Sequence, residues 1–194
     1  AELFSPIAYP MLIEPNDWTN ERAGGYLLNE IMLGHDMVRR GASCIQGETP
    51  IDFLNKIQKV GYALNPFTIM VADHCLDRGI SVGKFIPVVE YDLPNKPLDI
   101  DINKEARQSY KRECAEVYNK RADSFKRSCR TRMTMEAANL FRDKEEFYIP
   151  WSFDYRGRAY PIPAFLTPQD TDFGKSLLKF AKEAFMTPYA EDWL

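Results

Sequence analysis

WSFDYRGRAYP, residues 151–161, sets a single glycine between two arginines, with aromatic residues on both sides and a carboxylate in front. The guanidinium of arginine is a rigid fork of donors that matches phosphate oxygens, and glycine lets a backbone approach a ligand closely. The pattern therefore favours a short turn that presents Arg156 and Arg158 to phosphate groups. The alternative is a surface turn whose arginines pair with Asp154 and its neighbours, and the residue types alone leave both interpretations open.

The composition is that of an ordinary globular protein, and a length of 194 residues suits one domain or slightly more. The sequence contains no long apolar run, and residues 1–6 lack the pattern of a signal peptide, so we expect no membrane association. The four cysteines form no CxxC pair and only two histidines are present, so we expect reduced thiols and no metal site. The chain lacks a starting Met and stops within a helix-like pattern, so we expect a piece of a longer protein.

Positive charge is concentrated in one part of the chain. Residues 103–144 contain twelve Lys or Arg against six Asp or Glu, although the whole chain has a net charge of −3. Such a run is either the footprint of a nucleic-acid-binding surface or the solvated face of a helix, and both interpretations stay open. The residues of this run that we single out are Lys120, Arg121, Lys126, Arg127 and Arg130.

The first half of the chain predicts helices separated by turns. Residues 50–64 have apolar residues at helical spacing after Thr49 and a proline, and 66–77 repeat the same start signal. Before them, residues 9–13 fit a short strand. Gly24 and Gly25 favour a plain turn over a phosphate cradle, because no GxGxxG or Walker pattern surrounds them.

The second half begins with a proline-rich connector at 83–97, in which we expect a short edge strand at 85–86. Residues 103–142 contain neither proline nor glycine and predict two long helices or a helical hairpin, with a break near 122–124. A strand is expected at 147–151 and a helix at 175–182. The predicted fold class is mainly α with short β segments.

The segment 149–181 resembles the start of the palm in the single-subunit, bacteriophage-type DNA-directed RNA polymerases, a family that includes the mitochondrial enzymes. The family signature Asp-aromatic-Arg-Gly-Arg-x-Tyr is present at 154–160, followed by Pro-Gln-x-x-Asp at 168–172 and Lys-x-Leu-Leu at 175–178. Three upstream matches follow the family's order. They are Pro-Met…Trp-Thr…Gly-Gly-Tyr over 10–26, the Asn-x-x-Gln…Asn pattern at Asn55, Gln58 and Asn65, and the helix at 136–141 that leads into the palm. Tyr62 replaces the usual Trp, and Asp170 replaces the Gly of phage members, which leaves the path of that loop open.

The resemblance implies three parts. Residues 1–93 would be the helical, C-terminal part of the N-terminal domain, 94–147 a thumb built on long helices, and 148–194 the first, truncated palm segment. The parent protein would copy a DNA template into an RNA transcript from ribonucleoside triphosphates and Mg²⁺. The family's two metal-binding aspartates would lie beyond Leu194, so the resemblance implies no catalytic or metal-binding residue in this chain and no polymerisation by it alone. The parent is expected to be monomeric and to work in the cytoplasm of a phage-infected bacterium, or alternatively in a mitochondrion.

The same resemblance gives roles to single residues. Arg156 and Arg158 would contact the backbone of the template or hybrid, with Tyr160 packed beside them, and Lys175 is a further candidate for this channel. The basic thumb tip, formed by Lys120, Arg121, Lys126, Arg127 and Arg130, would close over the hybrid. Two rival hypotheses remain: a stand-alone, non-catalytic helical module that binds nucleic acid, and a structural partner protein that binds none.

Overall fold

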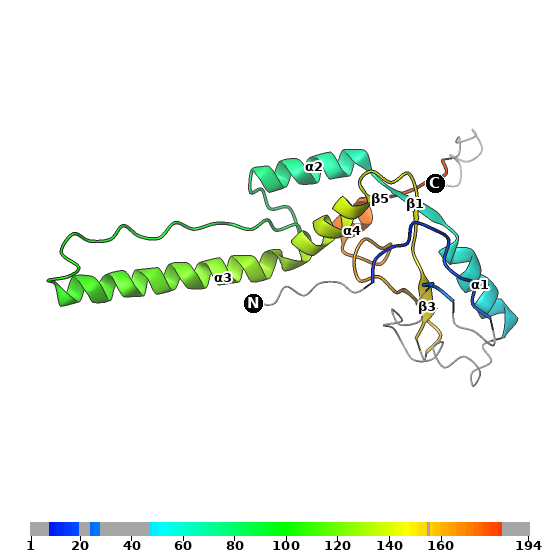
Figure 1. Cartoon of the computed structure of the whole chain (residues 1–194), viewed down its shortest axis with the longest axis horizontal. Coiled ribbons are helices and arrows are strands. Elements are labelled where there is room, and N and C mark those ends of the chain that lie inside the picture. The colour runs from blue at the N-terminus through cyan, green and yellow to red at the C-terminus, as the bar shows by residue number, and fades with distance from the viewer. Residues whose placement is uncertain (1–7, 20–23, 28–46, 155, 184–194) are drawn as a thin grey trace. The chain divides into compact units, whose positions relative to one another are not determined.

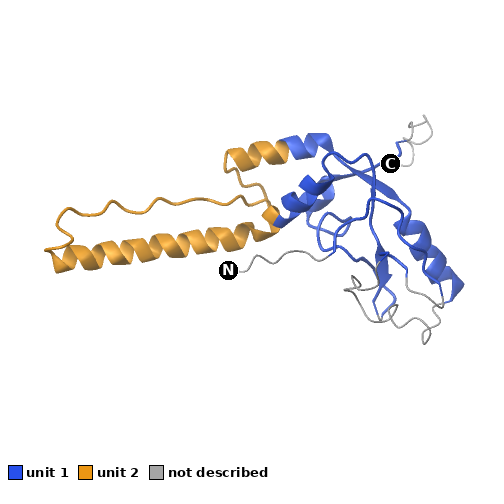
Figure 2. Ribbon diagram, in the orientation of Figure 1, with its two compact units in different colours: residues 1–70, 133–194 blue, residues 71–132 orange. Residues whose placement is uncertain are grey.

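The computed structural model describes residues 8–19, 24–27, 47–154 and 156–183 (Figure 1). The chain divides into two compact units, the first made of residues 1–70 and 133–194 and the second of residues 71–132 (Figure 2). The boundaries of these units differ from those of the predicted polymerase segments, which begin at 94 and 148. The polymerase segments stay a prediction. The helix-like pattern expected where the sequence stops, at 191–194, lies outside the described residues.

Most elements of the first unit are short. They are α1 (Glu48–Gln58), β1 (Gly61–Leu64), β2 (Phe147–Tyr148), β3 (Trp151–Phe153), β4 (Ala159–Pro161), α4 (Asp172–Ser176) and β5 (Leu178–Phe180). Strands β2, β1 and β5 form one antiparallel sheet in that order, and β3 pairs with β4 in a hairpin. Two longer helices, α2 (Pro66–Asp77) and α3 (Lys104–Phe141), complete the described structure. The predicted fold class, mainly α with short β segments, is confirmed.

Aromatic side chains hold the three-stranded sheet together. Tyr62 on β1 lies opposite Phe147 on β2 and Phe180 on β5, with ring centroids 6.5 and 5.7 Å away. The ring of Phe147 is fully buried and lies 4.9 Å from that of Phe141. Tyr62, which replaces the usual tryptophan of the resembled family, is thus a packing residue at the centre of the sheet.

The helix predicted at 50–64 is wrong in its second half. Helix α1 begins at Glu48, after Gly47, and ends at Gln58, and residues 61–64 form strand β1 instead. The side chain of Glu146 lies over Gly61 of this strand, in the space that a Cβ there would occupy. The apolar residues at 62–64 are buried through pairing with two distant strands, and helical spacing cannot reveal such partners.

The helix predicted at 175–182 is also wrong. Helix α4 ends at Ser176, and the following residues form β5, in which Lys179 pairs with Ala63 and Leu178 with Leu64. The predicted strand at 147–151 is split into β2 and β3 around Ile149 and Pro150. In the predicted strand at 9–13, only Met11 forms a bridge, and its partner is Tyr148.

Helix α2 agrees with its predicted range. The side chain of Asn65 caps it by accepting hydrogen bonds from the backbone N–H groups of Phe67 and Thr68, at 3.1 and 3.4 Å. Gly79, with φ of 63°, follows its end. Of its apolar residues, Ile69 and Ala72 are buried, whereas Met70 is 59% exposed.

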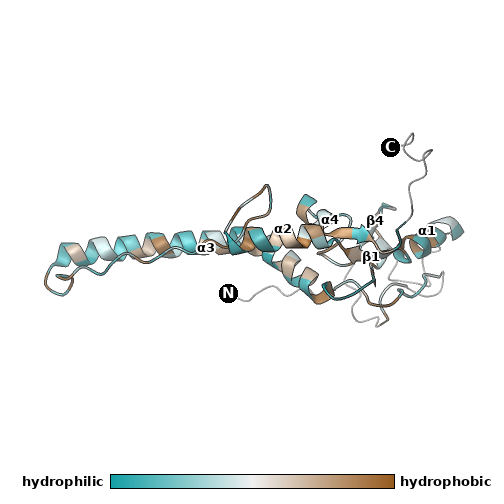
Figure 3. Cartoon of the chain, turned by 90° about the horizontal axis from the view of Figure 1, so that it is seen from above, coloured by the Kyte–Doolittle hydropathy of each residue, from teal (hydrophilic) through white to brown (hydrophobic). Residues whose placement is uncertain are grey.

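Helix α3 is continuous over 38 residues, so the predicted hairpin and the break near 122–124 are wrong. The side chain of Asn103 caps its start by accepting from the N–H groups of Glu105 and Ala106. No proline or glycine interrupts it, and the helix is largely hydrophilic along its length (Figure 3). The break was predicted because the apolar residues before and after 122–124 repeat on different faces of the helix, but this part of the helix instead contacts another segment.

That segment is an extended stretch, residues 81–93, which we call the strap. The hydroxyl of Thr131 accepts from the N–H of Ile86 at 3.0 Å, and that of Ser124 accepts from the N–H of Val89 at 2.7 Å. The guanidinium Nε of Arg121 donates to the carbonyl of Tyr91 at 2.7 Å. The strap thus runs antiparallel to α3 and covers its small polar residues. No helix within the described residues is long and apolar enough to cross a bilayer.

Candidate nucleic-acid interface

The predicted arginine turn closes the hairpin of β3 and β4, which we call the RGR hairpin. The N–H of Asp154 donates to the carbonyl of Arg158 at 2.8 Å, and the N–H of Gly157 donates to the carbonyl of Asp154 at 3.0 Å. Gly157 has φ of 79°, a left-handed conformation that suits glycine. The glycine between the two arginines is therefore needed by the backbone of the turn.

The carboxylate of Asp154 organises this turn from inside. It is 2% exposed, and its Oδ1 accepts from the N–H groups of both Arg156 and Arg158 at 2.9 Å. Its Oδ2 lies 3.3 Å from Nε of Arg156. The pKa of Asp154 is held below its ordinary value chiefly by the hydrogen bond from Arg158 N–H. Burial opposes this shift, and the N–H and guanidinium of Arg156 add to it. The turn therefore contains an ionised carboxylate at neutral pH.

The two arginines differ in what their guanidinium groups contact. Arg156 is exposed but pairs with Asp154, as the surface-turn interpretation expects. Arg158 is also exposed, and its guanidinium has no hydrogen-bond or ion-pair partner within the described part of the chain. Tyr160 is half-buried on β4, opposite Ser152 on β3. Arg158 is thus the better placed of the two to bind an external phosphate.

The loop at 162–171 supports the hairpin. Gln169 donates from Nε2 to the carbonyl of Ala159 at 3.0 Å. The carboxylate of Asp170 is buried and accepts from the N–H groups of Leu166 and Thr171, at 3.1 and 2.7 Å. Leu166 has φ of 58°, so its strained backbone is held by that bond. Asp170, whose effect on the loop path the sequence left open, therefore shapes the loop.

Lys175 lies on α4, which begins where the hydroxyl of Thr171 accepts from the N–H of Gly174. Its ammonium lies 3.4 Å from the carboxylate of Asp172, and both side chains are exposed. An exposed pair of this kind is weak, so Lys175 can exchange Asp172 for another anion.

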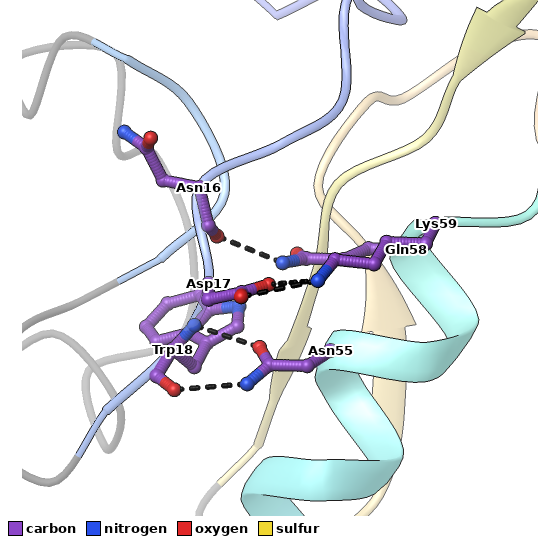
Figure 4. Close-up of polar contacts among 6 residues, drawn as sticks. All are labelled: Asn16, Asp17, Trp18, Asn55, Gln58 and Lys59. Carbon is purple, nitrogen blue, oxygen red and sulfur yellow. Dashed lines mark hydrogen bonds and ion pairs between the residues drawn. The ribbon is translucent and has the colours of Figure 1, made fainter.

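The upstream motifs of the sequence meet in a polar clasp between residues 16–18 and helix α1 (Figure 4). The side-chain amide of Asn55 accepts from the N–H of Trp18 at 2.7 Å and donates to its carbonyl at 3.0 Å. Gln58, fully buried, donates to the carbonyl of Asn16 at 2.8 Å. An ion pair of 2.8 Å between Lys59 and Asp17 completes the clasp. These motif residues are structural supports of the first unit.

The basic residues that the sequence singled out between 120 and 130 all lie on α3, but at neither a helix junction nor a tip. Residues 120–130 lie inside the continuous helix, and the turn before its start contains the exposed Asp99 and Asp101, so the predicted basic tip is wrong in position. Arg121 is bonded to the strap, whereas Lys120 and Arg127 line a groove beside it. Lys126 and Arg130 are exposed and do not line this groove.

No group of three or more His, Cys, Asp or Glu side chains could hold a metal ion within the described ranges. The sequence reasoning did not identify Gln169, Ser124 or Thr131 as supports of these two surfaces. Each acts on a backbone group that is distant in sequence, and no local pattern marks that role.

Comparison with known proteins shows which proteins this chain is similar to. No protein-family model matches the chain. T7 RNA polymerase of Escherichia phage T7 is 31% identical over 92% of this chain and 21% of its own length. The DNA-directed RNA polymerase of Enterobacteria phage K11 is 28% identical over 92% of this chain and 20% of its own length. DNA-directed RNA polymerase 2, chloroplastic/mitochondrial, of Arabidopsis thaliana is 26% identical over 95% of this chain and 19% of its own length.

The chain thus spans about one fifth of the length of the curated relatives that it matches. The matches include phage, mitochondrial and chloroplast polymerases, and each covers about nine tenths of the chain or more. The chain is therefore homologous, over most of its length, to a segment of the single-subunit RNA polymerases of phages and organelles.

Proposed function

We propose that this chain is the part of a DNA-dependent RNA polymerase that holds the template strand and the RNA–DNA hybrid. The complete polymerase would copy a DNA template into RNA from ribonucleoside triphosphates. The observation that supports this role best is the exposed guanidinium of Arg158, presented by a turn whose backbone is fixed by the buried carboxylate of Asp154.

In this proposal, Arg158 binds a phosphate of the template or hybrid directly, since its guanidinium fork matches phosphate oxygens. Arg156 adds positive charge but stays partly bonded to Asp154, and Tyr160 packs beside the strand. Lys175 makes a further contact after it leaves Asp172. Contacts of this kind position a strand without reading its sequence.

The basic residues of α3 would form a second contact with the hybrid, in the part proposed as the thumb, residues 94–147. Lys120, Lys126, Arg127 and Arg130 would contribute charge, whereas Arg121 would mainly hold the strap. The affinity of such binding should fall as the salt concentration rises. On duplex DNA, log affinity against log salt concentration has a slope of about −0.9 per neutralised phosphate.

Catalysis would need Mg²⁺, which stabilises the attacking and leaving oxygens of phosphoryl transfer when it is bound. We place its ligands in a part of the polymerase outside this chain, because the carboxylates near the arginines have other partners. Asp154 accepts from two backbone N–H groups and Arg156, and Asp172 pairs with Lys175. The chain alone would then bind strands without extending them. A monomeric polymerase and the cytoplasm of a phage-infected bacterium, or a mitochondrion, stay predictions.

An Arg158→Ala substitution tests the proposal. We expect it to weaken binding of a labelled single-stranded template by the chain about tenfold, because one charge-assisted hydrogen-bonded contact is lost. Arg156→Ala should have a smaller effect, since its guanidinium already pairs with Asp154. Fluorescence anisotropy over a salt series measures the affinity of both variants. The slope of log affinity against log salt concentration should be smaller by about one for Arg158→Ala.

Unchanged affinity and salt slope in Arg158→Ala would contradict the assignment of this residue. A chain without measurable binding would favour the structural partner protein. A stand-alone binding module would bind strands equally well, so the length of the natural coding frame separates it from a polymerase segment.

A further inference from the structure

A groove of about 300 Å³ lies between the strap and helix α3, within the second unit. This volume is at the lower end of the range for ligand-binding pockets. The strap contributes Ser81, Ile86, Pro87, Val89 and Tyr91 to its lining, and the helix contributes Lys120, Asp123, Ser124 and Arg127. The groove therefore combines apolar and aromatic groups on one wall with charged groups on the other.

The two walls are bonded to each other along the groove. The N–H of Val89 donates to the hydroxyl of Ser124, and Arg121 donates to the carbonyl of Tyr91, both at 2.7 Å. The N–H of Ile86 donates to Thr131 at 3.0 Å. These bonds fix the strap against the helix, so the groove is formed before any ligand arrives.

Only some of the basic residues of α3 lie on the face of the helix that lines the groove. Lys120 and Arg127 are seven residues apart, which is about two helical turns and about 10 Å along the axis, and both line the groove. Lys126 directly precedes Arg127, so it is about 100° away from Arg127 around the helix axis, and it does not line the groove. The two groove cations thus form a row on one edge of the helix.

We propose that this groove binds a single nucleic-acid strand, with phosphates on Lys120 and Arg127 and an unpaired base against the ring of Tyr91. This inference rests on the proposed function and names the strand contact of the second unit. The two cations lie about 10 Å apart along one edge of the helix, so they can hold two phosphates of the same strand. Tyr91 is 38% exposed, so part of its ring is open to stacking on a base, an interaction that tolerates any sequence.

The negative charge of Asp123 should oppose the binding of a phosphate in the groove. It lines the groove with Lys120 and Arg127, so the charged lining has two cations and one carboxylate. A phosphate in the groove would be attracted by the cations and repelled by Asp123. Removing the carboxylate charge should therefore tighten binding, which damage to the fold would not do.

The experiment compares two double variants of the chain with a fluorescent single-stranded oligonucleotide of about twelve nucleotides. Lys120→Ala/Arg127→Ala should weaken binding about tenfold or more, because both phosphate contacts are lost. Lys111→Ala/Arg112→Ala is the matched control, since it also removes one Lys and one Arg of α3, both exposed and outside the groove. It should weaken binding less than about threefold.

Two further variants test the groove itself. Asp123→Asn should tighten binding severalfold, and Tyr91→Leu should weaken it severalfold by removing the stacking surface. An oligonucleotide with a photoreactive halogenated uracil should cross-link to Tyr91 in the unaltered chain.

Equal losses in the two double variants, together with no cross-link at Tyr91, would overturn the groove while leaving strand binding by the chain intact. A tighter Asp123→Asn complex with a Tyr91 cross-link would support it. If the unaltered chain bound no strand, both the groove and the proposed function would fall.

Discussion

An Asp154→Ala substitution is expected to weaken strand binding by the chain more than about tenfold, because it removes the support of both Arg156 and Arg158. The carboxylate accepts from the N–H groups of both Arg156 and Arg158 and receives the guanidinium of Arg156. Without it, two N–H groups of the turn lose their acceptor and the turn loses its shape. The effect should therefore exceed that of Arg158→Ala.

The Asp154→Asn variant separates shape from charge. The amide oxygen of asparagine can still accept from the two N–H groups, but the ion pair with Arg156 is lost. We expect this variant to keep most of the strand affinity, measured by the same anisotropy assay. If Asp154→Ala bound strands as well as the unaltered chain, the carboxylate would not be what positions the arginines.

The pH dependence of the turn follows from the same carboxylate. Because the pKa of Asp154 is lower in the folded chain, its ionised form stabilises the fold above the ordinary carboxyl pKa of 3.8. This stabilisation is lost as the pH falls through the lowered value. The amide NMR signals of Arg156 and Arg158 should therefore titrate below pH 3.8. In Asp154→Asn this titration should be absent, and a midpoint above the ordinary value would contradict the proposed bonds.

Features set by neighbouring residues could be predicted from the sequence. Helix α2 has the predicted range because Asn65 caps its start and Gly79 follows its end. The arginine turn was predicted because its glycine and its carboxylate are within the turn itself. In these cases the hydrogen-bond partners lie only a few residues apart.

Features set by distant partners could not be predicted. Strands β1 and β5 pair residues more than a hundred positions apart, such as Ala63 with Lys179, and each was predicted to be helix. The break expected in α3 came from a change of apolar face near Ser124, where the hydroxyl of that residue instead binds the distant strap. The candidate site followed the same rule: Arg158 was identified, whereas its support by Gln169 through the carbonyl of Ala159 was not.

A Gly24→Val substitution is expected to destabilise the first unit by about 3 kcal/mol or more, because it forces a side chain into a filled space. A Cβ at Gly24 would lie 2.5 Å from the carbonyl oxygen of Asn16 and 2.6 Å from the backbone nitrogen of Trp18. These are backbone atoms of the polar clasp, so they cannot rotate away. The N–H of Trp18 also donates to Asn55, so the clash would separate residues 16–18 from α1.

Urea unfolding of the chain, followed by circular dichroism, measures this effect. Gly79→Ala is the matched control: a Cβ there meets no atom within 4 Å, so only its φ of 63° costs energy, about 1 kcal/mol. The loss of stability in Asn55→Ala should lie between those of the two glycine variants, because this substitution removes both hydrogen bonds to Trp18 without a clash. Equal midpoints for Gly24→Val and Gly79→Ala would show that residues 16–18 do not pack on α1 as described. The ordering of the three variants therefore tests whether the upstream motifs act as supports of the fold.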